Sequence, residues 1–154
     1  MSKEQTIKHI SRVQELVGGV IDNLHDRAAI HDKSKLESPE VEVFEEFTAK
    51  LAGSTYGSEE YEGFRLAMKP ALDHHYANNS HHPEFYSDGI KGMSLLDLTE
   101  MICDWKAATE RHDNGCILRS LEINQKRFGY SDELKQIFLN TVKELGFAPE
   151  PTPS

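Results

Sequence analysis

The sequence has few cysteines, no long apolar run and a deficit of positive charge, and each shortage excludes a class of protein. Its two cysteines, Cys103 and Cys116, are too few for a disulfide scaffold and do not form a C-x-x-C metal pair. No stretch approaches the ~20 apolar residues of a membrane span. The first residues are polar and charged, unlike a signal peptide, so we expect a cytoplasmic protein with reduced thiols and no membrane partner.

The charge balance bears on the binding partner. The chain has 17 Lys and Arg against 26 Asp and Glu, a net charge of −9. Duplex nucleic acid is therefore an unfavourable partner, because binding it depends on basic side chains that neutralise phosphates. A small phosphorylated substrate stays open, since a bound metal ion can supply local positive charge.

The length and the apolar pattern predict one all-α domain. Its 154 residues fit a single domain, which we expect over residues 1–147, followed by a disordered tail at 148–154. Apolar residues recur at steps of three and four, as in amphipathic helices, and no segment shows the alternation of a strand. The pattern predicts a compact bundle of six to seven helices. The expected helices cover residues 3–24, 39–51, 61–76, 94–113, 117–128 and 131–145.

Cap signals and turn formers mark several of these boundaries. Ser38 is a candidate N-cap with Pro39 in the first helical turn, and Ser94 with Asp97 resembles a capping box. Ser131 is a third candidate N-cap. Polar turn formers fill residues 77–92, which we expect to be a loop.

Histidine is the abundant residue of chemical interest. The chain has 8 histidines, and four of them lie between residues 74 and 82. Imidazole and carboxylate together suit a divalent first-row metal. Each member also has an ordinary interpretation: His9 as a surface histidine, Asp32 as a turn cap, and Asp104 as the partner of a nearby cation. The candidate ligands follow one another along the chain as His9, His31-Asp32, His74-His75, His81-His82 and Asp104.

This ordered set resembles the HD-domain superfamily of metal-dependent phosphohydrolases. The segments that carry the resemblance are residues 9–13 (HISRV), 31–35 (HDKSK), 74–75 (HH), 79–84 (NSHHPE) and 100–108 (EMICDWKAA). The resemblance departs from the superfamily pattern at Ser34, where a glycine is usual. The HDKSK and NSHHPE segments are also similar to an uncharacterised family of small phage and bacterial proteins.

The resemblance implies a ligand set and a cofactor. The cofactor would be one or two divalent transition metals, drawn from Mn, Fe, Co, Zn or Mg. The implied ligands are His9, His31, Asp32, His75, His82 and Asp104, with His74, His81 and Glu84 as additional candidates.

The resemblance also implies a reaction. We expect hydrolysis of a small phosphate ester, most simply a nucleotide, by a metal-activated water. Asp32 would hold the metal, Lys35 would neutralise the phosphoryl oxygens, and Glu100 or Glu84 could protonate the leaving oxygen. Two alternatives remain: a non-catalytic protein that binds metal or nucleotide, and a di-iron oxygenase with the same ligands. A homo-oligomer is compatible with each of these functions.

Overall fold

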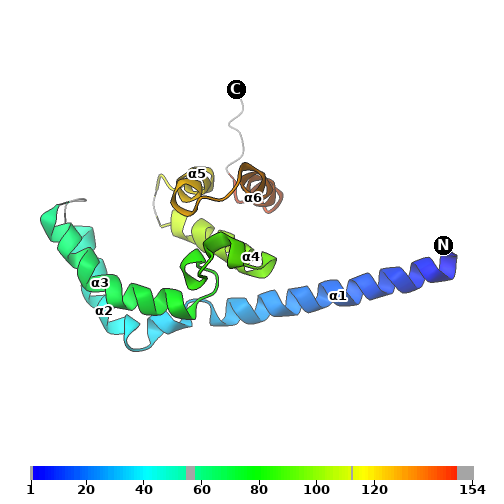
Figure 1. The fold of residues 1–154 in the computed structure, drawn as a ribbon, viewed down its shortest axis with the longest axis horizontal. Coiled ribbons are helices and arrows are strands. Elements are labelled where there is room, and N and C mark those ends of the chain that lie inside the picture. Colours follow the sequence, from blue (N-terminus) through cyan, green and yellow to red (C-terminus); the bar gives the residue numbers. More distant parts are fainter. Residues whose placement is uncertain (1, 55–57, 112, 149–154) are drawn as a thin grey trace, which may run out of the picture. The chain divides into compact units, whose positions relative to one another are not determined.

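The computed structural model describes residues 2–54, 58–111 and 113–148, and this part of the chain is helical (Figure 1). It contains six α-helices and three 3-10 helices, with no strand among the described residues. The all-α prediction is therefore confirmed. The chain divides into two compact units, residues 1–80 and residues 81–154. The predicted extent of a single domain stays a prediction, and residues 149–154 of the predicted tail lie outside the described part.

The first unit begins with a long helix, α1 (Lys3–Ile30). Ser2 and Gln5 form a capping box at its start, in which the Ser2 side chain accepts from Gln5 N and the Gln5 side chain accepts from Ser2 N. The helix extends six residues beyond the predicted end at Leu24, because residues 25–30 contain neither glycine nor proline. None of its side chains is buried.

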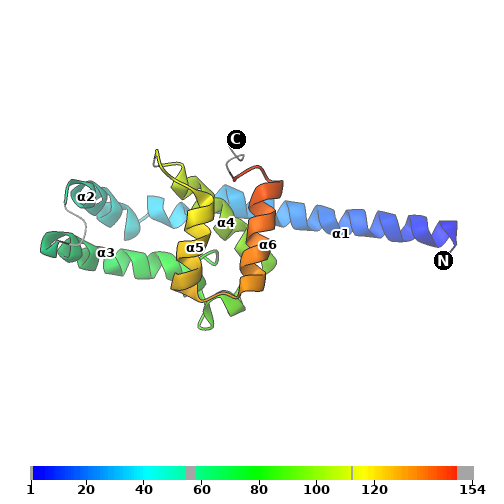
Figure 2. The same cartoon turned by 90° about the horizontal axis from the view of Figure 1, so that it is seen from above.

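Two helices pack side by side in the rest of the first unit (Figures 1 and 2). A 3-10 helix, η1 (Lys33–Leu36), leads into α2 (Glu40–Gly53), and α3 (Glu59–Asn78) follows. The prediction that Ser38 caps a helix starting at Pro39 is wrong. Pro39 itself holds the N-cap position, because the N–H groups of Glu40 and Val41 both donate to Glu37 O, at 3.0 Å.

The second unit contains three helices around an apolar core. They are α4 (Leu95–Thr109), α5 (Ile117–Phe128) and α6 (Asp132–Glu144). The predicted caps at Ser94 and Ser131 are confirmed, since each side chain accepts from a backbone N–H of the first turn. The buried core residues are Leu98, Met101, Ile102, Ile117, Leu121, Tyr130, Phe138 and Val142.

The histidine-rich segment is less irregular than expected. Helix α3 runs to Asn78, and two short 3-10 helices follow, η2 (Pro83–Phe85) and η3 (Gly89–Gly92). A Cβ atom at Gly92 would lie only 2.7 Å from the Tyr86 side chain, so this close approach requires glycine. The Tyr86 hydroxyl donates to Asp97 Oδ2 at 2.8 Å, which attaches the segment to the first turn of α4. No helix of the described residues is long and apolar enough to cross a membrane.

Candidate metal centre

A tight turn at the end of α1 positions the His31-Asp32 dipeptide. His31 is the C-cap of α1, and Asp32 adopts the left-handed conformation with φ of +54°. Aspartate is among the few non-glycine residues that enter this region readily. The next helical turn, η1, starts at once, with Lys35 N donating to Asp32 O at 2.9 Å. The backbone of Asp32 is thereby held on both sides.

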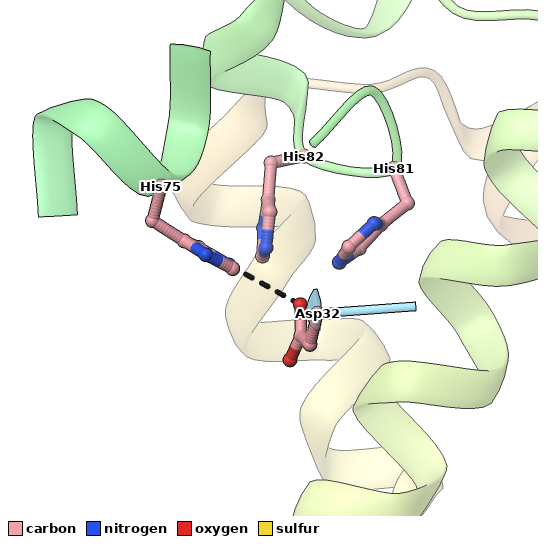
Figure 3. A group of neighbouring side chains, drawn as sticks. All are labelled: Asp32, His75, His81 and His82. Atoms are coloured by element: carbon pink, nitrogen blue, oxygen red, sulfur yellow. Dashed lines mark ion pairs between the residues drawn. The ribbon is translucent and has the colours of Figure 1, made fainter. Parts of the chain in front are cut away.

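Each carboxylate oxygen of Asp32 has its own neighbours. Oδ1 lies 3.3 Å from His75 Nε2, the ion pair drawn in Figure 3. Oδ2 lies 2.6 Å from Lys35 Nζ and 3.5 Å from His31 Nε2. Two ligand atoms that share one metal ion, each about 2.1 Å from it, lie about 3.0–3.4 Å apart. The Asp32–His75 spacing therefore fits two ligands of a common ion.

Glu40 is the buried carboxylate behind His75, and the sequence reasoning missed it. It begins α2 and is 0% exposed. Its Oε2 lies 2.9 Å from His75 Nδ1 and 3.1 Å from Ser34 Oγ, and its Oε1 lies 2.7 Å from His74 Nδ1. Burial raises the pKa of Glu40, but the hydrogen bonds from His74, Ser34 and His75 outweigh this effect and leave the pKa lowered. Glu40 is therefore ionised near neutral pH.

The contact with Glu40 sets the proton position on His75. An ionised carboxylate only accepts hydrogen bonds, so the Nδ1–H of His75 donates to Glu40 Oε2, and Nε2 is the ring nitrogen directed at Asp32. His75 is 1% exposed, and the Phe44 ring meets it edge-on at 6.3 Å between centroids. A carboxylate that fixes the tautomer of a buried imidazole is the usual outer partner of a metal-ligating histidine.

The residues just before His81 are tied to the same turn. The Asn79 side-chain amide donates to Ser34 Oγ at 2.9 Å and to the His75 carbonyl at 2.8 Å. Arg27 Nη1 donates to Ser80 Oγ at 3.4 Å. These bonds fix the end of the first unit, and the peptide chain continues directly from Ser80 into His81 and His82.

The second unit has its own donors. His81 is 2% exposed, and its Nδ1 lies 3.2 Å from Glu100 Oε1 on α4. Figure 3 shows the His81 and His82 rings side by side, with their centroids 4.1 Å apart. Asp104 follows Glu100 by four residues, so the two carboxylates share one face of α4. The Glu100 contact makes His81 a candidate as strong as His82, which the sequence had favoured.

Each unit supplies histidine and carboxylate residues that could hold a metal ion. They are His31, Asp32 and His75 in the first unit, and His81, His82, Glu100 and Asp104 in the second. They include all of the predicted ligands except His9. They also include His81, an additional candidate, and Glu100, which had been assigned a catalytic role.

Three predicted site residues lie elsewhere. His9 is exposed on α1, and at about 1.5 Å per residue it lies roughly 30 Å along the helix from His31. The structure therefore does not bring His9 together with Asp32. His74 is 41% exposed and contacts Glu40, and Glu84 pairs with Arg127 Nη2 at 2.7 Å.

Comparison with known proteins gives a family. A family model matches residues 1–145, which include every donor described above. The chain belongs to DUF5662, a family of unknown function. No curated protein and no solved structure matched it. For this DUF5662 chain, the all-helical fold and the His/Asp cluster are compatible with the HD-domain resemblance, which stays a hypothesis.

Proposed function

We propose that this DUF5662 protein is a metal-dependent phosphohydrolase that acts on a small phosphate ester, most simply a nucleotide. The observation that carries the proposal is the chain of contacts from Asp32 through His75 to Glu40. A buried carboxylate on Nδ1 that orients Nε2 toward a second donor is the arrangement found around metal-ligating histidines, and this likeness supports the proposal. The HDKSK resemblance supplies the reaction class by analogy.

The proposed ligands of the ion are Asp32, His75, His81 and His82, with His31 and Asp104 available for a second ion. A mixed set of imidazole nitrogens and carboxylate oxygens favours Mn, Fe, Co or Zn. A set of carboxylates alone would favour Mg or Ca. When bound, the metal supplies positive charge to the phosphoryl oxygens and lowers the pKa of the attacking water.

Two protein side chains have separate proposed roles beside the metal ligands. Lys35 is 36% exposed and sits beside Asp32, so its ammonium group can reach a phosphoryl oxygen and neutralise the charge that grows there. Glu40 acts as a positioning residue, because it holds the proton on His75 Nδ1 and keeps Nε2 available.

The reaction also needs a proton for the leaving group. As the water oxygen bonds to phosphorus, the bond from phosphorus to the ester oxygen breaks, and that oxygen takes up a proton. Glu100, whose Oε1 lies 3.2 Å from His81 Nδ1, is the carboxylate that can hold this proton. Glu84 is less suited to the role because it is paired with Arg127.

The first test is metal content and turnover together. The untagged protein, purified without chelator, is analysed for transition metals and then assayed for phosphate release from nucleoside phosphates. We expect about one or two equivalents of metal, lost in Asp32→Ala and kept in Asp26→Ala, a control that removes an exposed carboxylate from α1. Turnover should follow the metal in both variants.

Other outcomes distinguish the alternatives. Metal that binds at Asp32 without any phosphate release would favour the binding protein. Iron accompanied by oxygen uptake would favour the oxygenase. A protein that neither contains metal nor takes it up when metal is added would contradict the hydrolase, the oxygenase and the metal-binding protein.

A further inference from the structure

The long helix α1 carries an apolar stripe that its own unit does not cover. Ile10, Val13, Val17 and Val20 recur at steps of three and four, and between 42% and 51% of each residue is exposed. No side chain of this 28-residue helix is buried. Monomeric proteins seldom leave such a continuous apolar surface in water, and one usually marks an interaction site.

The charges of α1 avoid this stripe. With Ile10 and Val17 at the a positions of a heptad and Val13 and Val20 at the d positions, the flanking e and g positions are also uncharged. Ile7, Gln14 and Ile21 occupy the e positions, and His9, Leu16 and Asn23 occupy the g positions. The charged residues between Ile7 and Leu24 all fall on the outer c and f positions; they are Lys8, Arg12, Glu15 and Asp22. This distribution is typical of a helix that packs against another helix.

The first unit offers no helix to cover the stripe. Among its described residues, α2 packs against α3, and both lie against η1. The stripe from Ile7 to Leu24 is about 25 Å long at the helical rise of ~1.5 Å per residue. The element that matches it in length, spacing and lack of charge is a second copy of α1.

We propose that α1 is a self-association surface, on which the stripe of one chain packs against the stripe of another. Seven half-exposed Val, Leu and Ile side chains on each copy would remove roughly 1,100 Å² from water, at ~80 Å² per side chain. This area reaches the ~1,000 Å² that a specific interface requires. The proposal does not depend on the metal centre.

The test is the molar mass in solution, measured by light scattering on a sizing column over a range of concentrations. The matched variants are Val17→Asp in the stripe and Ser11→Asp on the outer face. Both add one carboxylate to an exposed position of α1 and replace residues of similar helix propensity. We expect twice the 17.5 kDa chain mass for the wild type and Ser11→Asp, and the single-chain mass for Val17→Asp.

Circular dichroism on the same samples shows whether each variant is still folded. Val17→Asp should retain the wild-type helical signal, because the substituted side chain is exposed in the single chain. If it unfolds, the milder Ile10→Ser variant should still shift the dimer toward the monomer at low concentration. A wild type that is monomeric at every concentration would overturn the proposal. A two-chain mass that persists in both stripe variants would do the same.

Discussion

The two units of the chain bury different kinds of side chain. In residues 81–154 the buried side chains are mainly apolar, and the aromatic rings of Trp105 and Phe128 stack at 6.1 Å. In residues 1–80 the most deeply buried side chains include Glu40 and His75, beside the much smaller apolar contribution of Met68 and Ala71. An apolar core stabilises a fold directly, whereas buried ionisable groups cost free energy unless they are fully partnered. The first unit therefore depends on the contacts that partner Glu40 and His75, whereas the second unit depends on its apolar core.

The largest expected effect is on the apolar core. Phe138 is 2% exposed and contacts Tyr130 and Trp105 through edge-on rings. Phe138→Ala should lower the free energy of unfolding by about 3–5 kcal/mol, through lost burial and the cavity left behind. Chemical denaturation measures this change. Metal per chain, measured where the variant is still folded, should stay at the wild-type value, and a selective loss of metal would contradict the division of roles.

Substitution of Glu40 should mainly lower metal affinity, in contrast to substitution of Phe138. Glu40→Gln keeps the shape but removes the negative charge that holds the proton on His75 Nδ1. We expect metal affinity to fall about 10–100-fold, as for other outer partners of histidine ligands. Calorimetric titration with Zn²⁺ measures the change, and Glu42→Gln, an exposed neighbour on the same helix, is the control. Equal affinities in the two variants would show that Glu40 has only a structural role.

These two residues also show what the sequence can and cannot predict. The position of Phe138 in a core follows from apolar spacing in α6, because period and burial are directly linked. The burial of Glu40 has no such signal, since several other acidic residues follow it in α2. Its role depends on the packing of α2 against α3, which brings it beside His75 across 35 positions of sequence.

The sequence singles out the candidate ligands because HD and HH dipeptides followed by an aspartate resemble a known ligand order. The distances between them in space have no such signal. His9 fits the order along the chain, but the continuation of α1 to Ile30 keeps it far from Asp32. The stripe on α1 was predictable as apolar, whereas its exposure depends on what the rest of the unit covers.

The stability of the second unit should depend on alkaline pH through Tyr130. Burial, followed by the charge of Glu122, raises the pKa of Tyr130 from 10.0 to about 12, and its hydroxyl donates to the Leu121 carbonyl. Because the folded pKa lies above the unfolded value, this contribution to stability is complete below pH 10 and is lost as the pH rises toward 12. Tyr130→Phe should lower stability by about 1 kcal/mol at neutral pH, the cost of one hydrogen bond.

Tyr130→Phe should also show a smaller fall in the free energy of unfolding at alkaline pH. The variant lacks the phenol, whose pKa differs between the folded and unfolded states. Urea denaturation at a series of pH values gives both results. An unchanged alkaline slope in Tyr130→Phe would mean that another group causes the decline. A Leu139→Ala variant, which trims a partly buried residue beside the core, should keep the wild-type slope and serves as the control.

The smallest effect is expected for Glu84, which the sequence offered as an additional ligand. Its carboxylate pairs with Arg127 Nη2 at 2.7 Å, and the Arg127 side chain is 55% exposed. Exposed pairs of this kind contribute about 0.2–1 kcal/mol, so Glu84→Gln should change stability by no more than this amount. Metal content and Zn²⁺ affinity should match the wild type, in contrast to Glu40→Gln. A loss of metal in Glu84→Gln would instead return Glu84 to the ligand set, and would mean that the carboxylate leaves Arg127 when the ion binds.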